Sequence, residues 1–284
     1  MIYMTRRVSF SAGKIDPPLG GDLVAGVAPS DLPEAYGHNY VLDVTVTGEI
    51  DPRSGVVVNI KTIDSVVRDL VTDRLDRKSL HRQTAEFRNR PATPESLAVW
   101  IAGELENNLP KEVTLAAVHI EETPLVRAEW VKAQPMNMKE QNSTSAPGVR
   151  STRVYEFAAS HRLHSKHLTD DENRELFGKC NYPHGHGHNY LLEVTVTGPV
   201  DTRTGRVIDP ALLDEIVHRM VVDRYDHRHL NYDIPELEDL VPSTEVVTRA
   251  IWERLVGEIP LPSRLASVLI RETARNIFEY RGEA

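Results

Sequence analysis

Two halves of this chain repeat one another at a constant offset of 150 residues, and this repeat limits the possible folds more than any other feature. Gly-His-Asn-Tyr occurs at 37–40 and again at 187–190, and Val-Thr-Val-Thr-Gly occurs at 44–48 and again at 194–198. The offset then persists in the pairs Asp76 and Asp226, Leu80 and Leu230, Glu95 and Glu245, Pro110 and Pro260, and Glu122 and Glu272. Near the start Phe10 corresponds to Phe157, so the first copy is slightly shorter there. An internal repeat of this length predicts two domains of one fold.

The segment between the copies predicts a linker. Residues 132–150 are polar, contain Pro, Gly and Ser, and show no hydrophobic period. We therefore expect a first domain at 1–131, a linker at 132–150 and a second domain at 151–284.

Within each copy the hydrophobic pattern predicts an α+β domain, an antiparallel sheet with helices packed on one face. The expected order is strand, insertion, long strand, turn, strand, helix, loop, helix, strand, strand. In the second copy the turn lies at 201–205 and one helix begins at Pro210. Another helix begins near Ser243 or Thr244 and ends near Gly257, and strands follow at 265–272 and 276–280.

Composition excludes several classes of protein. A net charge of -9 without a long Lys/Arg stripe argues against nucleic-acid and membrane-surface binding, although a local basic pocket for an anionic metabolite is compatible with it. No apolar run is long enough to span a bilayer, and the N-terminus becomes polar too early for a signal peptide. We expect a cytoplasmic, globular protein. Its single cysteine, Cys180, excludes an intrachain disulfide and a cysteine-rich zinc module.

The second copy carries a histidine pattern that predicts a catalytic metal site. His186 and His188 begin an alternating apolar run, and alternate residues of a strand point to the same side. His161, at the end of another predicted strand, can supply a third imidazole. Three histidines with an open position are typical of catalytic zinc. We expect a zinc ion held by His161, His186 and His188.

Other residues of the second copy are candidates for proton transfer and ligand binding. Cys180 lies within the histidine motif, and Asp226 precedes His227, where a carboxylate can orient an imidazole. Glu272 lies near the end of an apolar strand, where a carboxylate can accept paired N–H donors of an aminopyrimidine. The alternative for Glu272 is a structural ion pair with Arg271 or Arg275.

The first copy departs from this pattern at its chemical positions. It has Lys14, Tyr36, Ser30 and Arg77 where the second copy has His161, His186, Cys180 and His227. A protonated lysine is a poor zinc ligand, so the first copy is expected to bind no metal. It keeps Asp76 and Glu122, either as structural carboxylates or as part of a pocket.

These residues together resemble the 6-pyruvoyl-tetrahydropterin synthase family. The second half is similar to this family over residues 152–283, and the first half is similar in its sheet, hairpin and helices but not in its motifs. The motifs that carry the resemblance are Phe-Ala-Ala-Ser-His at 157–161, Asp-Glu-Asn at 171–173, Leu-Phe-Gly-Lys-Cys at 176–180, His-Gly-His-Asn-Tyr at 186–190, Asp226-His227, Ser-Thr-Glu at 243–245 and Arg-Glu-Thr at 271–273.

The resemblance implies two tandem tunnelling-fold domains, zinc on the three histidines and 7,8-dihydroneopterin triphosphate as substrate. By position it implies that Cys180, Asp226 and His227 transfer protons while triphosphate is eliminated. It implies that Glu272 anchors the pterin and that Ser243 and Thr244 line its pocket. It also implies a homo-oligomer, which for a tandem chain would be a trimer of chains.

Three alternatives follow from the same residues. The related 6-carboxytetrahydropterin synthase of queuosine biosynthesis has three residues between its cysteine and the first histidine of the motif, a spacing that Cys180 and His184 reproduce. The insertion at 168–180 favours the pyruvoyl enzyme. A pterin-binding regulatory protein without turnover is the second alternative, although such a protein would not need Cys180, Asp226 and His227 together. A cyclohydrolase-like activity is disfavoured because the chain has no second cysteine.

Overall fold

The computed structural model describes residues 1–15, 36–132 and 148–282. Most of the predicted linker, residues 133–147, lies outside this range, as does Ser30. The chain divides into two compact units, 1–151 with 197–207 and 152–196 with 208–284, which we call the first and second unit. The hairpin turn at 201–205 groups with the first unit, where the hydroxyl of Ser96 donates to the carbonyl oxygen of Gly205 at 3.3 Å. The predicted domain limits thus remain a sequence-based assignment.

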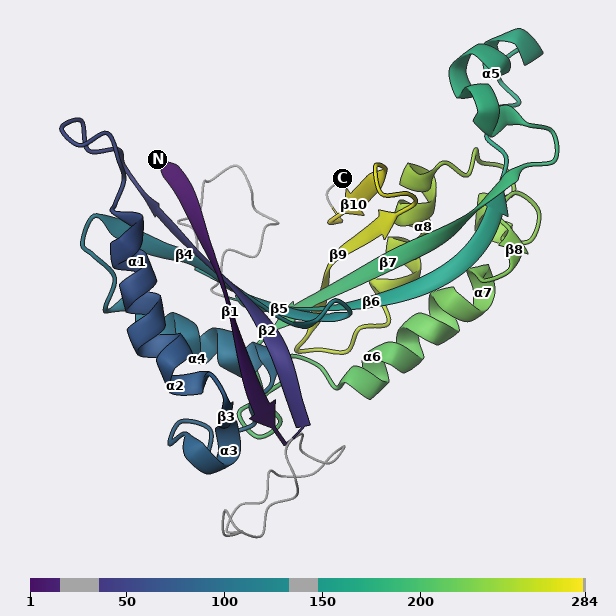
Figure 1. The fold of residues 1–284 in the computed structure, drawn as a ribbon. Helices are drawn as coiled ribbons and strands as arrows, with labels where there is room; N and C mark the ends of the chain where they lie inside the picture. The colour runs from purple at the N-terminus through teal and green to yellow at the C-terminus, as the bar shows by residue number, and fades with distance from the viewer. Residues whose placement is uncertain (16–35, 133–147, 283–284) are drawn as a thin grey trace. The chain divides into compact units, whose positions relative to one another are not determined.

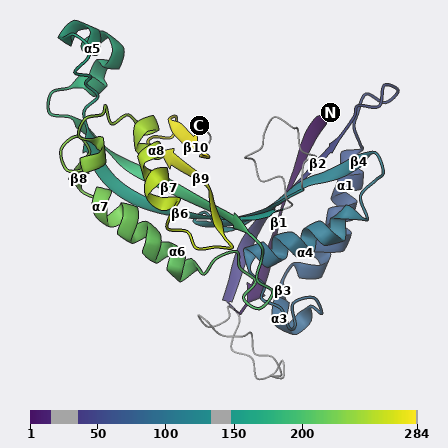
Figure 2. The same cartoon turned by 180° about the vertical axis from the view of Figure 1, so that it is seen from behind.

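The first unit is built on an antiparallel sheet whose strand order is β5-β4-β2-β1, with the short β3 parallel to β1. Its strands are β1 (Ile2–Lys14), β2 (Tyr36–Gly48), β3 (Lys78–Ser79), β4 (Val113–Thr123) and β5 (Val126–Val131). Alternate residues of β2 (Leu42, Val44 and Val46) are fully buried, as expected where one face of a sheet meets the core. The helices α1 (Ile60–Val67), α3 (Leu80–Gln83) and α4 (Pro94–Glu106) follow β2 along the chain. Figures 1 and 2 show α1 and α4 on one face of these strands.

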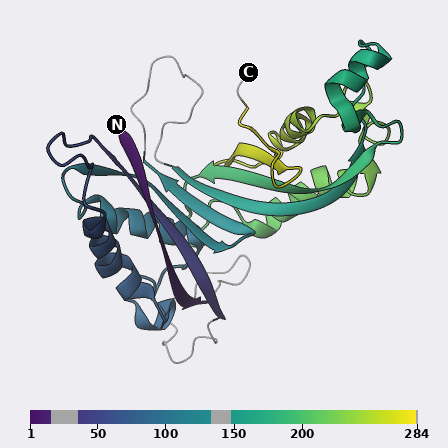
Figure 3. The same cartoon turned by 45° about the horizontal axis from the view of Figure 1, so that its top comes forward.

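The second unit repeats the arrangement with the order β10-β9-β7-β6 and with β8 parallel to β6. Its strands are β6 (Gly148–His161), β7 (His186–Gly198), β8 (Arg228–His229), β9 (Arg264–Arg271) and β10 (Ile277–Tyr280). Between β6 and β7 the chain forms α5 (Asp170–Phe177) and the 3₁₀ turn η2 (Gly178–Asn181), which extend beyond the ends of these two strands (Figure 3). A second 3₁₀ turn, η4 (Pro235–Leu237), precedes α8 (Thr244–Leu255).

Both units contain the same interrupted helix after the hairpin. In the second unit α6 (Pro210–Val217) passes into a π-helical turn η3 (His218–Val222) and then α7 (Asp223–Tyr225); in the first unit α1 passes into η1 (Arg68–Thr72) and α2 (Asp73–Leu75). π-helical turns are rare and are frequent near functional sites. Each run ends at an aspartate: Asp76, followed by Arg77, in the first unit, and Asp226, followed by His227, in the second.

Most of the predicted elements of the second copy are confirmed, and one strand is not. The helix from Pro210 and the helix from Thr244 form as expected, and β9 and β10 lie within a residue of their predicted limits. The strand expected between the turn and α6 is wrong. The side chain of Asp209 accepts a hydrogen bond from the backbone N–H of Ala211 and starts the helix, so too few residues remain after Gly205 to form a strand. Among the described helices, none combines the length and hydropathy required to cross a bilayer.

Candidate metal centre and active site

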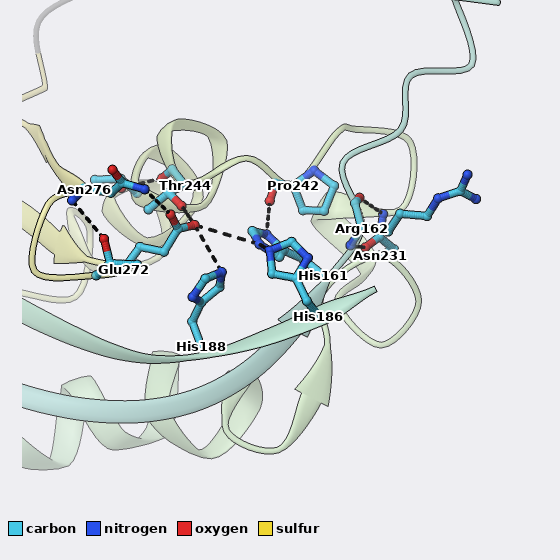
Figure 4. A network of polar contacts seen from close by, with 11 residues as sticks. His161, Arg162, His186, His188, Asn231, Pro242, Thr244, Glu272 and Asn276 are labelled. Carbon is cyan, nitrogen blue, oxygen red and sulfur yellow. Dashed lines mark hydrogen bonds and ion pairs between the residues drawn. The ribbon is translucent and has the colours of Figure 1, made fainter. Parts of the chain in front are cut away.

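Three imidazoles of the second unit converge at one point. His161 ends β6, and His186 and His188 begin β7, the neighbouring strand, on which alternate side chains point the same way. Their candidate ligand atoms all lie within 4.8 Å of one another. The Nε2 atoms of His161 and His186 are 3.2 Å apart. Figure 4 shows the three rings directed at a common space.

The donor set fits a zinc ion. Two Zn–N bonds of about 2.1 Å at a tetrahedral angle place the nitrogens about 3.4 Å apart, close to the His161–His186 separation. The Nδ1 of His161 lies 2.8 Å from the carbonyl oxygen of Pro242, which it can reach only as an N–H donor, and this leaves Nε2 unprotonated. Burial lowers the pKa of His161 and of His186, and neighbouring imidazoles lower both further. Both rings are therefore held neutral, the form that binds metal.

Glu272 lies beside the histidines and is fixed from two sides. Its Oε1 accepts a 2.5 Å hydrogen bond from the Thr244 hydroxyl, and its Oε2 accepts one of 2.9 Å from the Asn276 amide. Oε1 also lies 3.8 Å from the Nε2 atoms of His161 and His188 (Figure 4). Burial raises the pKa of Glu272, but these hydrogen bonds and the imidazoles outweigh it and hold the pKa below its usual value. The carboxylate is thus ionised and oriented.

The alternative for Glu272 was a structural ion pair with a neighbouring arginine, Arg271 or Arg275. Arg271 donates to Glu193 at 2.9 Å rather than to Glu272. The side chain of Glu272 remains next to the histidines, with carboxylate lone pairs beyond those used by Thr244 and Asn276.

Asp226 and His227 form a pair on a sharp bend. Asp226 Oδ1 accepts the backbone N–H of Ala158 in β6 at 2.8 Å, and Oδ2 lies 2.7 Å from His227 Nδ1. These contacts, that of Ala158 first, hold the pKa of Asp226 below its usual value. His227 adopts a left-handed backbone conformation with φ of 56°, and its side chain is 83 % exposed. A non-glycine residue in this region is uncommon and is often associated with function.

A cavity of about 860 Å³ lies between the histidine cluster with Glu272 and the Asp226–His227 pair. Its walls include His188 and Glu272 from the histidine side and His227 from the bend. Arg228, His229 and Asp233 are also part of the lining. The cavity is large enough for a small organic ligand and presents both carboxylate and imidazole groups to it.

Cys180 and Ser243 occupy separate positions around this centre. Cys180 lies in η2, is half-buried, and is not among the described residues that line the cavity. Its backbone carbonyl accepts the N–H of Leu163, which ties η2 to the residues after β6. Burial, with a smaller contribution from Glu272, raises the pKa of the thiol. Ser243 is the N-cap residue of α8, directly before the buried Thr244.

The first unit has a different arrangement at the equivalent positions. Lys14 and Glu122 form a buried ion pair, and Glu122 also accepts a 3.3 Å hydrogen bond from the Tyr40 hydroxyl. His38 Nε2 lies 3.7 Å from the same carboxylate, whereas Tyr36 is exposed. In the part of the chain that the structure describes, the histidine cluster of the second unit is the one group with metal-ligand geometry.

Sequence reasoning missed the residues that orient the site. Asn276 begins the return toward β10 and holds Glu272, and Pro242 fixes His161 through its backbone carbonyl. Asn231 exchanges hydrogen bonds of 2.8 and 2.9 Å with the backbone of Arg162, next to His161 (Figure 4). A carbonyl carries no signal in the sequence. Asparagine is common in turns for purely structural reasons, so Asn231 and Asn276 carried no specific signal either.

Comparison with known proteins gives consistent matches. A family model described as 6-pyruvoyl tetrahydropterin synthase matches residues 5–132 and 150–283. The human 6-pyruvoyl tetrahydrobiopterin synthase is 45% identical over 132 residues, which is 46% of this chain and 90% of the human protein. A dihydroneopterin monophosphate aldolase of Pyrococcus furiosus is 34% identical over 94 residues, 33% of this chain and 75% of that protein. The solved structure of the Caenorhabditis elegans 6-pyruvoyl tetrahydropterin synthase is 44% identical and covers 48% of this chain and 97% of that one, with a TM-score of 0.46.

Proposed function

Because this chain belongs to the 6-pyruvoyl tetrahydropterin synthase family, we propose that its second unit converts 7,8-dihydroneopterin triphosphate to 6-pyruvoyl-tetrahydropterin with elimination of triphosphate. The observation that carries the proposal is the convergence of His161, His186 and His188 beside one ionised carboxylate, Glu272, at a cavity that His188 and Glu272 line. The human relative is named a 6-pyruvoyl tetrahydrobiopterin synthase, and this name agrees with a lyase-type reaction.

The proposed cofactor is zinc bound by His161, His186 and His188. When bound there, zinc supplies a Lewis acid that acidifies substrate hydroxyls. Two observations support zinc. The imidazole nitrogens have a suitable spacing, and the hydrogen bond from His161 Nδ1 to the Pro242 carbonyl leaves the lone pair of His161 Nε2 free to bind a metal.

Glu272 is proposed to anchor the pterin. A carboxylate accepts two parallel N–H groups of an aminopyrimidine, and charge-assisted hydrogen bonds of this kind are short and strong. Thr244 and Asn276 hold the carboxylate in place before the ligand arrives, so little ordering is required on binding. Ser243, adjacent to Thr244, is proposed to line the same pocket.

The Asp226–His227 pair is proposed to move protons at the substrate side chain. Asp226 is fixed by the backbone of Ala158, and its carboxylate orients the His227 ring through Nδ1, which leaves Nε2 directed away from the pair. Cys180 is proposed as the partner in proton transfer. Its raised pKa means that the thiol holds its proton at neutral pH in the absence of ligand.

The test is to incubate the purified, zinc-loaded chain with 7,8-dihydroneopterin triphosphate without oxygen and to identify the products by mass spectrometry. We expect the pyruvoyl product together with triphosphate. A carboxy product with acetaldehyde would replace the proposed reaction by that of the 6-carboxytetrahydropterin synthases. Tight pterin binding without any product would instead support a regulatory protein.

We also propose that three tandem chains assemble into one particle. The single experiment needed is light scattering with the purified chain, and a mass equal to that of one chain, 31.9 kDa, would contradict the proposal.

A further inference from the structure

The first unit keeps a cavity at the place equivalent to the active-site cavity of the second unit. This cavity has a volume of about 460 Å³. Ala12, Gly37 and Asn39 line it, and their counterparts Ala159, Gly187 and Asn189 line the cavity of the second unit. A concave site has therefore been retained in the unit that lacks the metal ligands.

The charge of the retained cavity has changed. Arg77, Lys78 and Arg82 line it, and the described residues of its lining include no carboxylate. In the second unit Asp233 and Glu272 are part of the wall. The first unit thus presents a cluster of cations where the second presents a mixture of charges.

The described contacts of Arg77 and Lys78 offset only part of their charge. Asp76 Oδ2 lies 3.6 Å from Arg77 Nε, while Asp76 Oδ1 is occupied by the backbone N–H of Ser11 at 2.8 Å. Lys78 Nζ donates at 3.1 Å to a backbone carbonyl, that of Asp73, which carries no net charge. Among the described residues, the lining of the cavity is therefore positively charged, which favours an anionic ligand.

The backbone that presents Arg77 is also retained. Arg77 has φ of 58°, against 56° for His227, and its N–H donates to the Ser11 carbonyl at 2.6 Å, as that of His227 does to Ala158. A left-handed conformation costs an arginine on the order of 1 kcal/mol. The bend thus aims a guanidinium, 89 % exposed, where the second unit aims an imidazole.

We propose that this cavity binds an oligophosphate anion through Arg77 and Lys78. A guanidinium pairs with two phosphate oxygens at once, and an ammonium binds phosphate as a point charge. The hydroxyl of Ser79 lies in the same wall and is shielded from solvent without a hydrogen-bond partner among the described residues. The anion is either free triphosphate or the triphosphate group of an organic ester.

Calorimetric titration of the full chain with inorganic triphosphate and, separately, with ATP tests the proposal, and the tighter of the two identifies the source of the anion. Arg77→Asn is the informative variant because asparagine tolerates the left-handed conformation. Each lost charge-assisted contact is expected to weaken binding about tenfold or more. Lys78→Ser should act in the same direction, since the neutral side chain removes one cation.

The matched control is Arg88→Gln, which removes an equal charge from an exposed residue outside the cavity. This variant should bind the anion as the parent does. Arg77→Asn and Arg88→Gln should both keep the parent's thermal midpoint. Absence of binding to the parent at millimolar concentration would overturn the proposal. Equal affinity of the parent and Arg77→Asn would overturn it as well, because binding would then lie elsewhere in the chain.

Discussion

Lys14 and Glu122 form a buried ion pair in the first unit, at the positions that His161 and Glu272 occupy in the second. The side chains are only 3% and 8% exposed. A buried carboxylate needs a positive or hydrogen-bonding partner, and removal of one partner of such a pair typically costs about 3–5 kcal/mol. The lysine therefore supplies within the first unit the positive charge that Glu122 requires, whereas the equivalent position of the second unit holds His161, 3.8 Å from Glu272.

Restoration of the histidines should create a second metal site. In the double variant Lys14→His, Tyr36→His, the new imidazoles would join His38 in the arrangement of the second unit. We expect the zinc content per chain to double, since three imidazoles complete a tetrahedral site with one open position. Atomic absorption on the desalted protein measures this. The single variant Lys14→His is the control and should leave zinc content at the parental level; no gain in the double variant would contradict the equivalence of the two sites.

Substitution of His186 by Ala should abolish metal binding in the second unit. Two imidazoles remain, and the affinity of the centre falls because one of its ligands is lost. The variant should also lose the stabilisation that bound metal gives to the parent, about 2.7 kcal/mol at a free metal concentration of 100 times Kd. Thermal melts with and without a chelator measure it. His167→Ala removes an exposed histidine and should behave as the parent.

Replacement of Cys180 by Ala should separate turnover from binding. We expect product formation to fall by about 10²–10⁴-fold, the usual contribution of a group that transfers a proton. Zinc content and pterin affinity should be unchanged, because Cys180 lies in η2, outside the histidine cluster. Parental turnover in this variant would remove Cys180 from the reaction.

His227→Asn should lower turnover without a loss of stability. Asparagine accepts the left-handed backbone but cannot transfer a proton at neutral pH, so kcat should fall by about 10²–10⁴-fold. The comparison variant His227→Val places a β-branched residue at a φ of 56°, and we expect a cost of about 1–3 kcal/mol in the free energy of unfolding. Full activity of His227→Asn would rule out the proton-transfer role.

Glu95 should make stability depend on pH. Burial raises its pKa above the ordinary 4.5, although the Ser151 hydroxyl donates to it at 2.9 Å. A carboxyl with a raised pKa in the folded state contributes stability that is present below 4.5 and is lost as pH rises through the folded pKa. Urea unfolding at a series of pH values above 4.5 should therefore show falling stability in the parent. Glu95→Gln should flatten this fall, and an unchanged slope would contradict it.

The sequence alone was sufficient for features that depend on short-range patterns. The repeat, the alternation that places His186 and His188 on one side of β7, and the helix starts at Pro210 and Thr244 are all readable because periodicity and capping act within a few residues. The strand expected after the turn failed for the same local reason, since the Asp209 cap competes for those residues.

Only the tertiary structure decided how distant segments meet. β9 lies next to β7, and the chain just after β9 therefore brings Glu272 within 3.8 Å of His188; Asp226 is fixed by Ala158 in β6. The same packing buries Lys14 against Glu122. These contacts depend on strand order and register, which arise from packing of the whole core and leave no periodic signal in the sequence.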